Sequence, residues 1–197
     1  MPIPDPIAEL FQKLVTLPNT GKERDDRLGI AVEQCMAAFE TKRASVEGRL
    51  LIADGRAAYC DLLRDRVAHY RNRIRSFLAT IDPSSEALSL SIPNQHALRD
   101  FYHDAYYCLF FAARHALVRS GGYDCSQHAI MARQLARRFE NDATASAAAK
   151  NLEKFQTDRN DSDYVMSIER LAPLASTTTI SDRVEALDGI LKPWNLF

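Results

Sequence analysis

The sequence predicts an all-α protein: a helical bundle with an N-terminal extension made of a helical hairpin or of one long helix. Three observations support this fold class. Apolar residues recur at intervals of three and four along most of the chain, which is the spacing of one helix face. No segment shows the alternation of apolar and polar residues that is typical of a strand. Only 7 of the 197 residues are glycine, and 46% are hydrophobic, which excludes a disordered chain.

The bundle is expected to form around one helix over residues 98–120. Apolar residues cover most of the circumference of this helix, so other helices must surround it. Charged residues interrupt the segment too often for it to span a bilayer. The positions that we expect in the core are Leu98, Phe101, Tyr102, Ala105, Tyr106, Leu109, Ala113, Ala116 and Leu117.

The N-terminal part is predicted to be a lead-in followed by an arm. Residues 1–21 form a proline-rich stretch and a short helix, and residues 22–81 have coiled-coil-like apolar spacing. Asp54-Gly55 is a turn signal near the middle of the arm, which favours two helices, about 22–53 and 56–81, folded as a hairpin. A single long helix is the alternative, and from Asp26 to Ile81 it would be about 85 Å long.

Residues 82–96 are expected to form a linker and the main domain boundary, before a bundle at 97–197. After the central helix, further helices are predicted at about 126–140, from 141 to Phe155, around Tyr164 to Leu171, and at 181–191. The polar run 158–163 is interpreted as the junction at which a new helix begins, capped by Asp158 or Asn160. Pro173 and the threonine run 177–179 are expected to end that helix.

Arginines are frequent in the second half of the arm, where Arg64, Arg71 and Arg75 share one stripe of the predicted helix. The favoured interpretation is that they form ion pairs with acids of the hairpin partner. The acids with heptad spacing there are Glu33, Glu40 and Glu47. The other interpretation is an electrostatic track for RNA phosphates.

Charge and cysteine content narrow the function classes. The chain has 25 Lys and Arg against 26 Asp and Glu, which disfavours nucleic-acid binding through a global positive field but allows a local patch. The four cysteines lack metal-ligand spacing, so we expect free thiols and no metal site. No glycine-rich phosphate loop or nucleophile elbow occurs, and no cofactor is predicted. Without a visible secretory signal, the expected location is a reducing bacterial cytoplasm, with no membrane partner.

Residues 102–139, YHDAYYCLFFAARHALVRSGGYDCSQHAIMARQLARRF, resemble the HEPN domain family, and most closely a bacterial branch of it. In that branch the central helix carries a Tyr-Tyr pair, then an aromatic residue, Ala-Ala-Arg and a Leu. A glycine ends this helix and a His opens the next one, here Gly121 and His128. An Arg motif ending in Asp-Tyr then appears near the start of a late helix, and its residues here are Arg159, Asn160, Asp163 and Tyr164. The resemblance covers about residues 97–190.

The resemblance implies a bundle of four to five helices, often a homodimer with the Arg motif lining a cleft at its interface. Many HEPN proteins are metal-independent ribonucleases, in which the Arg stabilises the scissile phosphate and a His four to six residues later transfers a proton. Arg159 and Asn160 match this pattern, and Tyr164 stands where that His is expected. A Tyr titrates near ~10 and is a poor base at neutral pH, so we expect weak or absent cleavage. His128 or His103 could enter the cleft instead, although a His on a helix face is more often structural.

We therefore expect a HEPN protein that is associated with RNA or a nucleotide in a defence or toxin–antitoxin system. Such a protein would be either a degenerate metal-independent ribonuclease or a non-catalytic binding module. The alternative is a non-catalytic helical adaptor or partner-binding subunit of a larger complex. The expected partners are a second copy of the chain, RNA or a nucleotide, and a nucleotidyltransferase or another defence protein. The candidate catalytic residues are Arg159, Asn160 and Tyr164, and the candidate nucleic-acid-binding residues are Arg64, Arg71 and Arg75.

Overall fold

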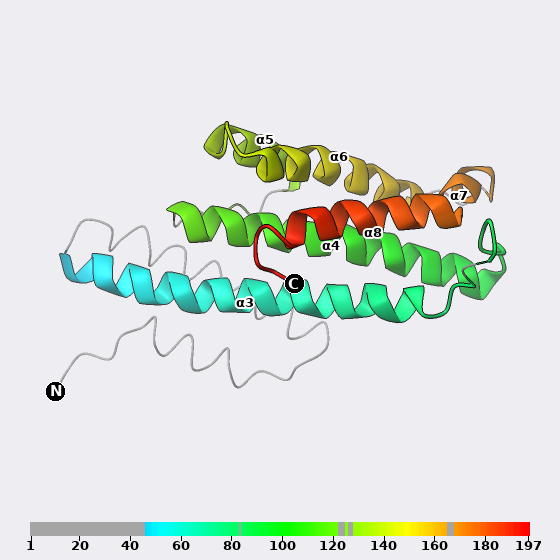
Figure 1. Ribbon diagram of the computed structural model, residues 1–197, viewed down its shortest axis with the longest axis horizontal. Helices are drawn as coiled ribbons and strands as arrows, with labels where there is room; N and C mark the ends of the chain where they lie inside the picture. The colour runs from blue at the N-terminus through cyan, green and yellow to red at the C-terminus, as the bar shows by residue number, and fades with distance from the viewer. Residues whose placement is uncertain (1–45, 83, 122–124, 126–127, 165–167) are drawn as a thin grey trace. The chain divides into compact units, whose positions relative to one another are not determined.

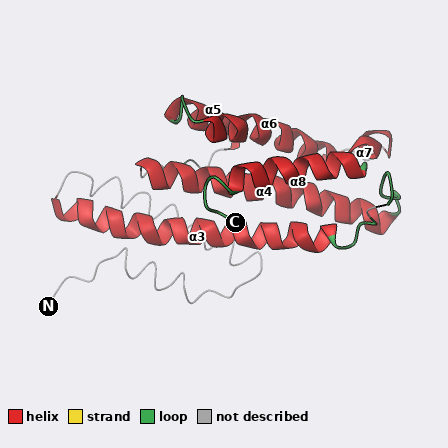
Figure 2. Ribbon diagram, in the orientation of Figure 1, coloured by secondary structure: helices red, strands yellow, loops and turns green. Residues whose placement is uncertain are grey.

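The computed structural model describes residues 46–82, 84–121, 125, 128–164 and 168–197. These residues are 81% helical and form six helices and no strand, which confirms the predicted all-α bundle (Figures 1 and 2). The chain divides into two compact units, Met1–Asp61 and Leu62–Phe197. The predictions for residues 1–21 and for the arm up to residue 45 lie outside the described residues.

The longest apolar helix, α4 (Ile92–Gly121), is the core of the second unit. All nine apolar residues predicted for its core face are buried, from Leu98 to Leu117. α4 packs against α5 and α6 and also against α8, and Figure 1 shows it between the second half of α3 and the α5–α6 pair. The other helices are α3 (Val46–Leu78), α5 (His128–Arg138), α6 (Ala143–Tyr164), α7 (Ile168–Leu174) and α8 (Thr177–Leu191).

The part of α3 that belongs to the second unit packs against α4. Val67 and Ile74 of the predicted apolar seam are buried, at 0% and 2% exposure. Farther along, the Phe77 ring stacks on Phe101 with 4.8 Å between centroids. The Cys108 thiol of α4 also donates to the backbone oxygen of Val67, at 3.6 Å. The seam is therefore a real helix–helix contact, and its partner here is the central helix.

The structure differs from the favoured hairpin turn and from the expected linker, while the alternative of an unbroken helix agrees with α3 over its described residues. α3 continues through Asp54 and Gly55, because one glycine costs a helix only about 1 kcal/mol and cannot end a helix of 33 residues by itself. The predicted linker 82–96 is also shorter than expected, since α4 already begins at Ile92 with a proline in its first turn. That connection joins two helices of one compact unit, so it is not a domain boundary.

The prediction of a helix junction at 158–163 is wrong as well. α6 runs without interruption from Ala143 to Tyr164, and its polar residues Asp158 and Ser162 are buried rather than capping a new helix. The last helix begins at Thr177, four residues earlier than predicted. The Thr177 hydroxyl donates to the backbone oxygens of Ser85 and Glu86, at 2.9 and 3.0 Å. This contact with the α3–α4 connection explains why the threonine run starts a helix.

Cys60 and Cys108 are buried, as predicted for cysteines within helices, and Cys125 is buried as well. Burial raises the pKa of the Cys108 thiol to about 12, so this group remains protonated and unreactive at neutral pH. These side chains act as small apolar residues of the core.

Candidate functional site

One face of α4 carries a row of aromatic side chains, spaced by three and four residues. It includes His103, Phe110, Phe111 and two adjacent tyrosines, Tyr106 and Tyr107, which we call the tyrosine pair. Within the pair, Tyr106 is buried at 1% exposure, whereas Tyr107 remains half-buried. Side chains from α3, α5 and α6 reach this face, so the row is where several helices bring polar groups together.

The residue that α6 contributes is Arg159. Its guanidinium carbon lies 5.2 Å from the centre of the Tyr107 ring and 5.6 Å from that of Tyr106, within the range of a cation–π contact. Its Nε donates to Asp163, one helical turn later, at 3.1 Å. Within the described residues, no hydrogen bond or ion pair engages its two terminal nitrogens. The side chain is 21% exposed, so part of a fixed cation remains accessible from solvent.

The position of Arg159 in α6 also suits its charge. We expected the arginine near the start of a helix, where it would oppose the helix dipole. The structure places it five residues before the last residue of α6, in the second half of the helix, so Arg159 does not oppose the positive end of the dipole.

The residue that α5 contributes is His128, its first residue. Its ring stacks on Phe110 at 4.2 Å, and its Nδ1 shares a 2.5 Å hydrogen bond with the Tyr106 hydroxyl. Burial lowers the pKa of His128, and the positive charges of Arg159 and Arg114 lower it further. Burial also raises the pKa of Tyr106, which keeps its hydroxyl protonated. His128 is therefore a neutral imidazole at pH 7, able to accept a proton.

The row itself contains a second histidine, His103, one helical turn before the tyrosine pair. The His103 ring is 4.6 Å from the Tyr107 ring, and its Nδ1 is 3.3 Å from a carboxylate oxygen of Asp104. Asp104 is buried and accepts a 2.7 Å hydrogen bond from Nε of Arg73 in α3. Arg73 thus fixes the carboxylate of Asp104, which also contacts the imidazole of His103.

An aromatic residue of α3, Tyr70, stacks on the aromatic row of α4. The Tyr70 ring stacks on Tyr107 at 5.7 Å and on Phe111 at 5.8 Å, with interplanar angles of 22° and 11°. Such pairs contribute about 0.5–1.5 kcal/mol each beyond the burial of their area. This stacking keeps the Tyr107 ring in place beneath the guanidinium of Arg159.

The structure places the predicted catalytic residues as follows. Arg159 lies at the tyrosine pair, while Asn160 is exposed on the next position of the helix. Tyr164 is the last residue of α6, and its side chain lies outside the described residues. His128, which we named as an alternative proton-transfer group, lies close enough to Arg159 for their charges to interact.

The three arginines predicted to bind nucleic acid have different environments. Arg64 and Arg75 are exposed, but Arg71 is buried and pairs with Asp188 of α8 at 3.5 Å. The Arg71 guanidinium also lies 3.4 Å from the centre of the Phe197 ring. Arg71 therefore forms an intramolecular ion pair with an acid of the bundle, and not with one of the acids that we expected in the hairpin. The predicted partners in the hairpin, from Glu33 to Glu47, lie outside the described residues.

Sequence reasoning did not identify the tyrosine pair as part of the site, because it assigned Tyr106 to the apolar core face and used Tyr107 only in the motif of the resemblance. A usable signal was present. Two adjacent tyrosines in a helix direct their hydroxyls about 100° apart, so one core position cannot satisfy both. Here the Tyr106 hydroxyl bonds to His128, and Tyr107 stays partly open to solvent.

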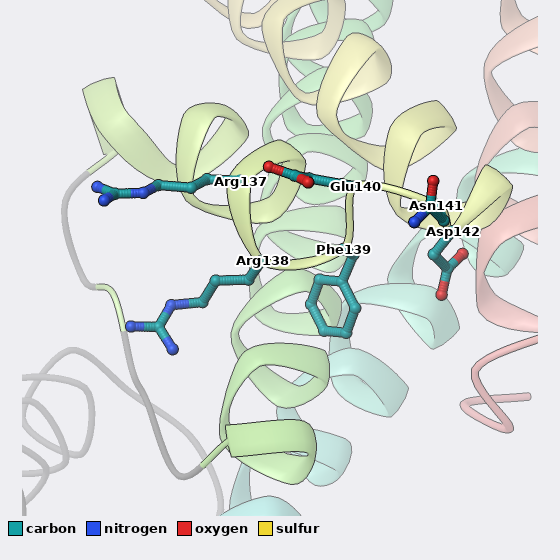
Figure 3. Close-up of a pocket in the computed structure, with 6 residues that line it drawn as sticks. All are labelled: Arg137, Arg138, Phe139, Glu140, Asn141 and Asp142. Carbon is teal, nitrogen blue, oxygen red and sulfur yellow. The ribbon is translucent and has the colours of Figure 1, made fainter.

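A surface hollow lies away from these residues, at the turn between α5 and α6 (Figure 3). Its lining residues are Arg137, Arg138, Phe139, Glu140, Asn141 and Asp142. Asp142 accepts a hydrogen bond from the backbone nitrogen of Ala145 at 3.0 Å and so caps α6. In Figure 3 the two arginines extend to one side and Asp142 lies on the other, without a shared centre for a ligand.

Within the described part of the chain, no three His, Cys, Asp or Glu side chains gather in a way that could hold a metal ion. None of the described helices combines the length and the hydropathy that a bilayer span needs. Comparisons with protein-family models, curated proteins and solved structures found no match to this chain.

Proposed function

We propose that this chain is a HEPN-like protein that binds and cleaves RNA at the tyrosine pair, within a bacterial defence or toxin–antitoxin system. The observation that carries the proposal is that α5 and α6 bring His128 and Arg159 to the same two tyrosine rings. These residues are far apart in the sequence, and a guanidinium and an imidazole are the groups that metal-independent RNA cleavage uses for charge stabilisation and proton transfer. The family assignment and the defence setting rest on the sequence resemblance.

In the proposed reaction, Arg159 holds the scissile phosphate through its terminal nitrogens and stabilises the charge that develops on it. In the tautomer with a proton on Nδ1, His128 donates to the Tyr106 oxygen, and its Nε2 can accept the proton of the ribose 2′-hydroxyl. The 2′-oxygen attacks phosphorus and the bond to the 5′-oxygen breaks. The leaving 5′-oxygen takes up a proton from water, which yields a 2′,3′-cyclic phosphate and a 5′-hydroxyl, and the His128 imidazolium returns its proton to solvent. In this proposal His128 supplies the imidazole, because Tyr164 occupies the position at which the family pattern has a His.

The test is RNA cleavage in the presence of EDTA by the full chain, with analysis of the product ends. Arg159→Ala should abolish cleavage, with a loss of at least ~3 kcal/mol in transition-state stabilisation, and His128→Gln should reduce it by about 100-fold or more. Arg133→Ala is the matched control, because it removes the same charge from an exposed position of α5. Cleavage that survives Arg159→Ala would show that the active site lies elsewhere.

A non-catalytic RNA-binding role is the second candidate, and the Asp163 contact favours it. Asp163 neutralises part of the charge of Arg159, which weakens its pull on a phosphate. In that case the wild-type chain would cleave nothing, and Arg159→Ala would lower RNA affinity only. The Asp163→Asn variant should then bind RNA more tightly than the wild type, since the guanidinium loses its internal partner.

We also propose that the chain forms a homodimer, as the resemblance implies. Light scattering at tens of micromolar should give twice the mass of the 22.2 kDa chain. A monomer at that concentration would remove the model of a cleft shared by two copies, and the adaptor alternative would become stronger.

A further inference from the structure

The last two turns of α6 carry interacting polar residues on two different faces. Arg159 and Asp163 lie on one of them and form the ion pair at the tyrosine pair. Asp158 and Ser162 lie about 100° away around the helix, and both are buried. Each of these two buried residues is bound by an arginine from a different helix, so this end of α6 is held from two sides.

The first arginine is Arg183 of α8. Its Nε and Nη2 donate to the two carboxylate oxygens of Asp158, at 2.5 and 3.3 Å. The two side chains are only 9% and 10% exposed. A bidentate arginine–carboxylate pair fixes orientation as well as distance. Because Asp158 directly precedes Arg159, the pair sets how far α6 is rotated and shifted at the site.

The second arginine is Arg99 of α4. Its Nε donates to the backbone oxygen of Ser162 at 2.8 Å. This oxygen is among the last four carbonyls of α6, which have no partner inside the helix. The Ser162 hydroxyl in turn donates to the backbone oxygen of Arg159 at 2.9 Å. Arg99 therefore caps the helix end and is connected to Arg159 through one serine.

We propose that Arg99 and Arg183 are positioning residues that hold Arg159 over the tyrosine pair for RNA binding; this inference rests on the proposed function. A slip of α6 by a single residue would move the guanidinium by about 1.5 Å along the helix and turn it by about 100°. Misplacement of a catalytic or binding group by about 1 Å can cost about 100-fold in rate. Neither arginine needs to contact the RNA for this effect.

The test is a double-mutant cycle on RNA affinity. We would measure the Kd for single-stranded RNA by fluorescence anisotropy in EDTA for the wild type, Arg99→Gln, Arg159→Ala and the double variant. Arg99→Gln should weaken binding about 10-fold or more in the wild-type background and by less than about 2-fold when Arg159 is absent. Arg99→Lys keeps a donor for the Ser162 oxygen and should restore most of the affinity. Arg133→Gln is the surface control.

A second readout needs no RNA. The Arg159 Hε proton is donated to Asp163 and the guanidinium carbon lies near two tyrosine rings, so the NMR resonance of Hε reports the position of the guanidinium. Arg99→Gln and Arg183→Lys should both shift this resonance, whereas Arg133→Gln should not. If the resonance stays in place, or if Arg99→Gln weakens RNA binding equally with and without Arg159, the positioning role is wrong. If the wild type binds no RNA but the resonance moves, the proposed function fails and the positioning of Arg159 stands.

Discussion

The ion pair between Arg183 and Asp158 gives the most specific prediction about stability. Arg183→Met removes the charge but keeps an unbranched side chain of similar reach, so the carboxylate of Asp158 stays buried without its partner. Breaking a buried pair in this way costs about 3–5 kcal/mol. Since domains of this kind have total stabilities of about 5–15 kcal/mol, the variant should lose about a fifth of its stability or more. The melting temperature should fall by roughly 10 °C.

Urea unfolding followed by circular dichroism would measure this loss as the free energy of unfolding. The double variant with Asp158→Leu and Arg183→Met removes both charges and should recover most of the stability, because a buried pair can be replaced by apolar residues at little cost. A loss below about 1 kcal/mol for Arg183→Met would show that water reaches the carboxylate and would refute the reasoning. A double variant as unstable as the single one would show that packing, and not charge, causes the loss.

Three other positions give further predictions. Because the pKa of His128 is lowered in the folded state, stability should be complete above about pH 6.5 and fall as the pH drops below it, and His128→Gln should make urea unfolding less dependent on pH. Gly189 lies exposed in α8 with no atom within 4 Å of an added Cβ, so Gly189→Ala should raise the free energy of unfolding by about 0.5–1 kcal/mol. Arg71→Gln should destabilise the fold and leave the salt dependence of RNA binding unchanged. The pair Arg64→Gln and Arg75→Gln should instead make that dependence shallower if these exposed arginines contact RNA.

The central helix was predictable because its signal is local. Its apolar residues repeat at helical spacing over twenty positions, and the same residues are buried in the structure, with Leu98 and Leu117 at 0% exposure. The helix boundaries were less predictable. Gly55 indicated a turn, but its small local cost cannot outweigh the many backbone hydrogen bonds of a continuous helix.

The polar run in α6 could not be interpreted correctly from its neighbours in the sequence. Asp158 resembles a helix cap when only local residues are considered. Its actual partner, Arg183, is 25 residues later, and the partner of Ser162, Arg99, is 63 residues earlier. Arg71 shows the same limit, since its ion pair with Asp188 spans 117 residues. A helix periodicity indicates which face is buried, but it does not indicate which distant charge meets a polar residue there.

The candidate site could be predicted only in part, because it also depends on contacts between residues that are far apart in the sequence. Arg159 was identified from its motif, and His128 was named as an alternative, but only the packing of α5 and α6 on α4 brings the two together. The role of Tyr106 as their common neighbour depends on that packing.

The errors in the helix prediction and the proposed site fall on the same few residues of α6. Asp158, Asn160 and Ser162 are poor helix formers, so the local sequence opposes the helix that the fold imposes. Two long-range contacts, from Arg183 and Arg99, offset this local cost. Natural proteins tend to retain such conflicts between local preference and fold where a site requires them. A better helix former at 158 would remove the anchor that holds Arg159 over the tyrosine pair. This requirement explains why residues of low helix propensity stand next to Arg159 in α6.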